Sequence, residues 1–217
     1  MKTKSVVVIG LGTFGSSVAR SLAGFGNQVL GIDSDEQRVA RLADVLSDIV
    51  IADARDENAL REAGVEGYDT AVVAIGEDLE ANILCTMNAR TLGVANVWVK
   101  ALSETHHRIL SKLGADRIIH PEEEMGQHIA QVLHNPMIRD YISLGNGLYV
   151  VDIQIPEALD GYALGDSQLD SYRIHCLGQM RGTELVPGTE EDRILQVGDR
   201  LLLFGERDNL RRFGDTI

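Results

Sequence analysis

The fold of this chain is decided near its N-terminus by the stretch Val6-Val-Val-Ile-Gly10-Leu-Gly12-Thr-Phe-Gly15. A short apolar run leads into three glycines spaced GxGxxG, and a helical pattern opens directly after them. Gly10 permits a tight turn, Gly12 lets a phosphate approach the backbone, and Gly15 allows a helix to pack closely on a strand. The stretch therefore predicts the first βαβ unit of a Rossmann domain, whose helix N-terminus presents amide hydrogens to a phosphate.

An acidic residue stands where such a domain holds a ribose. The apolar run Gln28–Ile32 ends at Asp33, about 20 residues after the glycines, where a carboxylate accepts hydrogen bonds from both ribose hydroxyls. The same carboxylate disfavours a 2′-phosphate, so an adenine nucleotide other than NADP is expected. The alternative is a glycine turn kept for packing, with Asp33 capping the next helix.

A second acidic residue, Asp53, follows the third apolar run together with Ala54. In a Rossmann sheet this loop lies near the adenine, so Asp53 is expected to accept a hydrogen bond from the exocyclic amine. A solvent-facing turn aspartate is the alternative.

The first 135 residues alternate apolar runs with amphipathic stretches such as Glu36–Leu46, whose apolar residues share one stripe. Several runs are apolar on both faces, which is typical of a parallel sheet covered on both sides. We therefore predict an α/β fold, a doubly wound Rossmann sheet over residues 1–135. Its six strands are expected at Val6–Ile9, Gln28–Ile32, Ile49–Ala52, Thr70–Ala74, Val97–Lys100 and Arg117–Ile119.

The pattern changes after Pro136. Residues 136–146 are expected to form a linker or crossover with a short helical piece, Met137–Leu144, that ends at the turn residues Gly145-Asn146-Gly147. From residue 147 to 217, closely spaced strands predict a second, smaller α+β domain. These strands are expected at Leu148–Ile155, Arg173–Met180, Glu184–Val186 and Arg200–Gly205.

Composition excludes several classes of function. The formal net charge of −13 repels nucleic acid, and neither a basic stripe nor a basic amphipathic helix offsets it. No apolar run approaches the roughly 18–20 residues that cross a bilayer, and the apolar start is too short for a signal peptide, so a cytosolic chain without membrane insertion is expected. Cys85 and Cys176 are expected to be free, buried thiols. His106 and His107 diverge by about 100° on a helix and are not expected to share one metal ion.

The sequence offers fewer candidates for a catalytic site than for a nucleotide-binding site. The C-terminal half is small for a substrate domain, and it shows no Ser/His/Asp or Cys/His nucleophilic arrangement. We therefore expect a chain that is not an enzyme. The alternative is a small NAD-linked oxidoreductase whose catalytic residues are completed by another subunit.

Several motifs occur in an order that resembles one family. They are Gly10-Leu-Gly-Thr-Phe-Gly15, Gly31-Ile-Asp33, Val73-Ala-Ile-Gly76, Val97-Trp-Val-Lys100-Ala and Gly114-Ala-Asp-Arg-Ile-Ile-His-Pro-Glu122. Together they resemble the RCK (regulator of K⁺ conductance) proteins, and among them the cytosolic gating subunits of Trk/Ktr-type potassium uptake systems. The resemblance covers the whole chain, with residues 147–217 matching the RCK C-terminal domain.

The resemblance implies a regulatory subunit at the inner face of the cell membrane. Paired Rossmann domains would assemble, usually as an octameric ring, beneath a membrane-embedded potassium channel or transporter, with the region between the domains crossing to a second subunit. ATP and ADP, or NAD(H), would bind the glycine loop at Gly10, Gly12, Thr13, Phe14 and Gly15. Asp33 would bind the ribose, Lys100 would lie near the phosphates, and Glu122 would bind a cation, Mg²⁺ or Ca²⁺, beside the nucleotide.

Two further expectations rest on this resemblance. Ktr-type members often carry arginine where this chain has Thr13, and that arginine reaches the γ-phosphate of a neighbouring subunit's ATP. Weaker discrimination of ATP from ADP is therefore expected here, because Thr13 offers one hydroxyl in place of a fixed charge. In the C-terminal domain, Arg173 and His175 lie where some members bind cyclic di-AMP, although strand alternation alone also explains their exposure.

Overall fold

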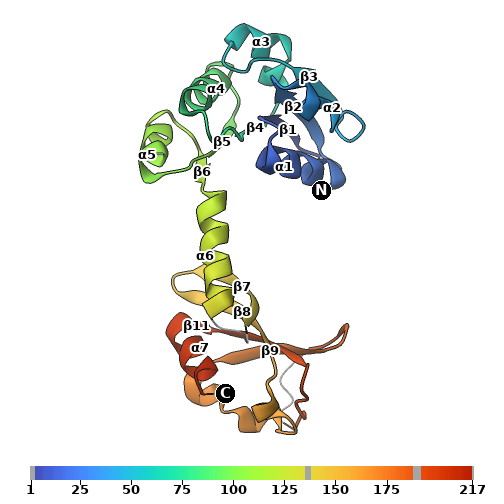
Figure 1. Ribbon diagram of the computed structural model, residues 1–217, viewed down its shortest axis with the longest axis vertical. Helices are drawn as coiled ribbons and strands as arrows, with labels where there is room; N and C mark the ends of the chain where they lie inside the picture. The colour runs from blue at the N-terminus through green and yellow to red at the C-terminus, as the bar shows by residue number, and fades with distance from the viewer. Residues whose placement is uncertain (1–2, 135–137, 188–191, 217) are drawn as a thin grey trace. The chain divides into compact units, whose positions relative to one another are not determined.

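The computed structural model describes residues 3–134, 138–187 and 192–216. The chain separates into two compact units, Met1–Glu124 and Met125–Ile217 (Figure 1).

The first unit is built on a parallel sheet of six strands in the order β3-β2-β1-β4-β5-β6. Reversal of the strand order beside β1 is the arrangement of a Rossmann sheet. All six predicted strands are confirmed, with ends within one residue of those expected. Their bounds are β1 Ser5–Ile9, β2 Gln28–Asp33, β3 Asp48–Ile51, β4 Thr70–Val73, β5 Asn96–Lys100 and β6 Arg117–Ile119.

Helices cover both faces of this sheet. Val6 and Val8 of β1 pack in one core cluster with α1 and α2, whereas Val7 and Ile9 pack in another with α3, α4 and α5. Successive side chains of a strand point to opposite faces, so β1 is buried on both sides. The helices are α1 Thr13–Gly24, α2 Glu36–Ala40, α3 Glu57–Glu62, α4 Leu79–Thr91 and α5 Glu104–Lys112, and a 3₁₀ turn, η1, spans Val65–Gly67.

The predicted helix Glu36–Leu46 is shorter than expected. α2 ends at Ala40 and turns follow it, yet Leu42 and Leu46 are still buried. A Cβ on Gly31 would lie 2.7 Å from Leu46 Cδ1, so Leu46 packs directly against the bare backbone of β2. Tertiary packing of this leucine takes precedence over continuation of the helix.

The second unit contains an antiparallel sheet in the order β10-β9-β11-β8-β7, with one core cluster that includes Val151, Ile153, Leu201 and Leu203. The four predicted strands are present, although the one expected from Arg173 starts at His175, because Arg173 has a left-handed φ of 56°. The strands are β7 Ile138–Gly145, β8 Leu148–Gln154, β9 His175–Arg181, β10 Glu184–Pro187 and β11 Arg200–Glu206; the helical elements are η2 Glu157–Leu159, η3 Leu164–Ser167, η4 Leu169–Tyr172 and α7 Arg207–Gly214.

The predicted helical piece Met137–Leu144 is wrong. Residues Ile138–Gly145 form β7, which pairs with β8 through a two-residue turn, while Met137 lies outside the described residues. Asn146 and Gly147 both have positive φ, 51° and 77°, as the tight turn of a hairpin requires. The turn residues therefore closed a hairpin rather than ending a helix.

The two units are joined through α6, Pro121–His134, which begins in the first unit and continues into the second. None of its residues is buried, and Met125, Ile129 and Leu133 are exposed at successive turns. Elsewhere, both cysteines are free and buried, as predicted. Among the described residues, no helix combines the length and apolar character needed to span a membrane.

The contact between α1 and β1 gives a first prediction. A Cβ on Gly15 would lie 1.8 Å from the carbonyl oxygen of Gly10, whereas a Cβ on Gly12 meets no atom within 4 Å. Gly15→Ala should therefore lower the free energy of unfolding by about 1–3 kcal/mol, and Gly12→Ala, the control at the N-cap, should lower it by less than about 1 kcal/mol. Urea denaturation measures both, and equal effects of the two substitutions would contradict this account of the loop.

Candidate functional site

The glycine loop joins β1 to α1 at the carboxyl edge of the parallel sheet. Gly10 has a φ of +92° and donates its N–H to Ile32 O at 2.8 Å, which ties the loop to the end of β2. Gly12 caps α1 without a side-chain hydrogen bond, and no acidic residue lies in the first turn. The first amides of a helix have no partner within it, so the N-terminus of α1 is suited to an anion.

The three glycines have different reasons to be glycine. Gly10 needs its positive φ, and Gly15 has no room for a side chain beside Gly10 and Ala74. At Gly12 the protein itself would accommodate a Cβ. Packing within the chain therefore does not require glycine at position 12.

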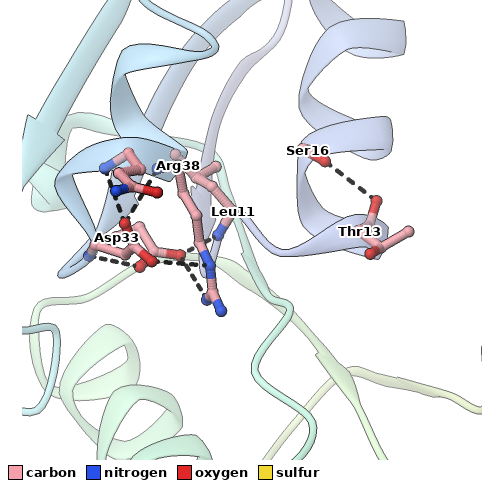
Figure 2. A network of polar contacts seen from close by, with 7 residues as sticks. Leu11, Thr13, Ser16, Asp33 and Arg38 are labelled. Carbon is pink, nitrogen blue, oxygen red and sulfur yellow. Dashed lines mark hydrogen bonds and ion pairs between the residues drawn. The ribbon is translucent and has the colours of Figure 1, made fainter.

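Asp33 braces the same loop from the end of β2. Its Oδ2 accepts the Leu11 N–H at 2.6 Å and its Oδ1 accepts the Asp35 N–H at 2.9 Å, and the residue is 7% exposed (Figure 2). Capping of α2 falls to Asp35, which accepts from the amides of Gln37 and Arg38. A carboxylate has about four acceptor positions, so Asp33 retains capacity for a sugar hydroxyl.

Arg38 was missed in the sequence analysis. Its Nη1 lies 3.5 Å from Asp33 Oδ2, its Nε lies 3.5 Å from Asp35 Oδ2, and its side chain is half exposed (Figure 2). The signal was available, because an arginine in the first turn after an acidic strand end reaches back to that end. The guanidinium places a cation and a flat face beside the carboxylate of Asp33.

Lys100, Glu122 and Phe14 are brought together at the end of β5. Lys100 Nζ lies 2.5 Å from Glu122 Oε1 and 5.8 Å from the centroid of the Phe14 ring. The Lys100 side chain is 11% exposed and that of Glu122 is 60% exposed. The hydrogen bond from Lys100 holds the pKa of the Glu122 carboxyl below its ordinary value.

Gly76 and Asn82 position Lys100, although the sequence analysis gave neither residue a role. A Cβ on Gly76 would lie 3.1 Å from Lys100 Nζ, so the absence of a side chain at position 76 leaves space for the ammonium. Asn82, fully buried on α4, donates to Lys100 O at 3.0 Å and also to Ile75 O, which joins the ends of β4 and β5. Its signal was a polar side chain on the buried face of a helix.

The carboxylate of Asp53 is already hydrogen-bonded within its own loop, which the sequence analysis did not predict. Arg55 binds the Asp53 carboxylate through Nε, at 2.9 and 3.0 Å, and through Nη2, at 2.6 Å, and these hydrogen bonds lower the pKa of Asp53. Ala54 is buried, and its carbonyl accepts from Asn88 Nδ2 at 3.1 Å. An adenine amine at Asp53 would therefore share the carboxylate with Arg55.

Histidines near the end of β6 do not form a metal cluster. His107 Nδ1 lies 2.9 Å from His120 Nε2, whereas His106 is buried, which lowers its pKa. Across the described residues, no group of three or more His, Cys, Asp or Glu side chains is placed to hold a metal ion. Within this unit Glu122 thus offers a cation one carboxylate, which fits a role as a single ligand among phosphate oxygens.

The residues of the cyclic di-AMP hypothesis lie in the second unit. Arg173 follows η4 and lies outside the strand, and His175, at the start of β9, stacks on Phe204 with 6.2 Å between ring centroids. This hypothesis stays a prediction from the resemblance.

The ion pair at the end of β5 gives a second prediction. Lys100→Met removes the hydrogen-bond donor, so the pKa of Glu122 should rise toward its ordinary value of 4.5. In the wild type the depressed pKa means that the pair stabilises the fold above about pH 4.5 and that this contribution is lost as the pH falls through the lower folded pKa. Carboxyl NMR titration measures the shift, with exposed Glu124 as the internal control. An unchanged pKa of Glu122 would contradict the pairing.

Comparison with known proteins identifies the family of this chain. The sequence model of the TrkA-N domain matches residues 6–121, more than half of the chain. Ktr system potassium uptake protein A of Vibrio alginolyticus is 36% identical over 213 residues, which cover 97% of both chains. The protein of the same description from Bacillus subtilis (strain 168) is 34% identical over 214 residues, covering 98% of this chain and 96% of its own.

A solved structure described as the GsuK channel bound to NAD superposes with a TM-score of 0.65 at 14% identity. It covers 96% of this chain, which spans 38% of that one, and the likeness is one of fold. The domain match and the full-length relatives together show that the chain belongs to the TrkA-N (RCK N-terminal) domain family, among the relatives of Ktr system potassium uptake protein A.

Proposed function

We propose that this chain is a nucleotide-binding, cytosolic regulatory subunit that gates a membrane potassium channel or transporter. The observation that carries the proposal is the N-terminus of α1, whose amides receive no side-chain cap. The loop before it donates the Leu11 N–H to Asp33, the proposed ribose-binding carboxylate. Relatives that match almost the whole chain are named as potassium uptake proteins, which supports the transport role.

We assign the phosphates, the ribose and the adenine of the nucleotide to different residues by their chemistry. Its phosphates rest on the amides of the first turn of α1, at Thr13 and Phe14, with Lys100 supplying a positive charge. The ribose hydroxyls bond to Asp33, with Arg38 beside it. The adenine lies toward Asp53 and Ala54, where Arg55 already holds the aspartate.

ATP and ADP are the proposed ligands, with NAD(H) as an alternative that shares the ADP half. In this geometry a divalent cation, Mg²⁺ or Ca²⁺, would be held by Glu122 together with phosphate oxygens and would neutralise their charge. The cation supplies electrostatic bridging only, and no bond in the nucleotide is broken.

The regulatory step needs a second copy and a partner. We propose that the first units pair and assemble into a ring, an octamer in the usual arrangement of the family, and that the second unit is an RCK C-terminal domain. Ligands with different affinities for two shapes of the ring shift the equilibrium between them, and the membrane partner follows. The exposed apolar residues of α6 are consistent with packing against another copy.

The ribose site gives a third prediction, with Asp35 as a matched control. Asp33→Asn removes the charge that accepts the sugar hydroxyls, so ADP affinity should fall about ten- to a hundredfold. Asp35→Asn removes the same charge from an exposed cap two residues away and should change the affinity less than about threefold. Isothermal titration calorimetry measures both, and circular dichroism verifies the fold, because Asp33 also holds Leu11.

If Asp33→Asn folds like the wild type and binds ADP with unchanged affinity, the site assignment is wrong. If the wild type binds neither ATP, ADP nor NAD, with or without Mg²⁺, the proposed function itself fails.

Thr13 gives a fourth prediction. Because one hydroxyl replaces the arginine of related chains, the wild type should prefer ATP over ADP by less than about tenfold, and Thr13→Arg should increase that preference. Calorimetric titration of each nucleotide measures the ratio. A wild-type preference above this level, or no gain in the variant, would exclude position 13 as the source of discrimination.

A further inference from the structure

The two side chains of the Lys100–Glu122 pair differ in exposure. The lysine side chain is nearly nine-tenths buried and is confined by Gly76, with Leu102 close by, and by the ring of Phe14. Its backbone is fixed by Asn82. Glu122, in contrast, is 60% exposed in the first turn of α6, so its carboxylate can leave into water while the ammonium stays in place.

A buried ammonium requires an anion. Removing its counter-ion without replacement leaves an uncompensated charge, which is far more costly than losing a surface pair. Glu122 supplies this anion. Releasing its carboxylate costs little free energy, because exposed carboxylates are well hydrated. Any stronger anion that reaches Lys100 therefore takes the place of Glu122 at small cost.

The position of Lys100 determines which anion that is. Its Nζ lies 5.8 Å from the centroid of the ring of Phe14, which is the second residue of α1, and the phosphates are proposed to bind at the N-terminus of that helix. A diphosphate on that turn carries more charge than one carboxylate and lies beside the same ammonium.

We propose that Glu122 is an internal competitor of the nucleotide: its carboxylate occupies Lys100 in the nucleotide-free chain, and a phosphate displaces it on binding. This inference rests on the proposed function and adds its regulation. One ion pair is broken and one is formed, and the released carboxylate becomes available to the cation that accompanies the phosphates. The exchange occurs at the first turn of α6, so occupancy of the loop changes the start of the helix that continues into the second unit.

The test compares two neighbouring glutamates. ADP is titrated calorimetrically in EDTA into the wild type, Glu122→Gln and Glu124→Gln, all full-length. Glu122→Gln should bind ADP about three- to tenfold more tightly than the wild type, because the competitor is gone. Glu124→Gln removes the same charge from an exposed site in the same helical turn and should stay within about twofold.

Equal gains in the two variants would show a general charge effect and would overturn the exchange. So would unchanged or weaker binding in Glu122→Gln. When Mg²⁺ is added, the wild type should gain affinity and the advantage of Glu122→Gln should shrink, because the variant has lost its cation ligand; an advantage that persists undiminished counts against the released carboxylate binding the cation.

A second readout uses the wild type and needs no variant to fold. In ¹³C spectra at fixed neutral pH, saturating ADP in EDTA should shift the side-chain carboxyl resonance of Glu122, because its hydrogen-bond donor has moved to a phosphate, while the resonance of Glu124 should move less. A Glu122 carboxyl resonance that does not move in the complex overturns the exchange, even if ADP binds and Asp33→Asn weakens binding as the proposed function requires. If the wild type binds no nucleotide, both proposals fail together.

Discussion

The close contact between Gly15 of α1 and the carbonyl of Gly10 determines how the rest of the first unit can function. With no side chain between them, the helix starts directly against the end of β1, and its first amides face out over the carboxyl edge of the sheet. Asp33 then fixes the loop from β2 through the Leu11 amide. A larger residue at position 15 would move the helix, and with it the amides that are proposed to hold a phosphate.

An anion site in an acidic chain needs local compensation. The formal net charge is −13, so long-range attraction does not bring a nucleotide to this protein. Helix amides and one confined ammonium act over a few ångströms instead, and both are placed by buried residues. Lys100 itself is paired with the carboxylate of Glu122.

Much of the first unit followed from the sequence, because its signals are local. Six apolar runs predicted the six strands, and the glycine spacing predicted the loop between β1 and α1. Asp33 lies at the end of β2, as the same motif predicts. Three features depend on tertiary contacts and were not predicted: the early end of α2, set by Leu46 on Gly31; the role of Asn82, which joins two strand ends; and the pairing of Lys100 with Glu122 across 22 residues. In the second unit, Met137–Leu144 was assigned to a helix, because the strand pairing of Ile138–Gly145 depends on a turn that the pattern alone did not distinguish from a helix end.

The central claim is that phosphates rest on the first turn of α1. The most direct measurement follows the backbone amide resonances of Gly12, Thr13 and Phe14 in ¹H–¹⁵N spectra during titration with ADP. We predict large downfield proton shifts at these amides, because they become donors to a charged oxygen, together with smaller changes along β3. Saturation with ADP that leaves these three resonances in place while others move would contradict the account.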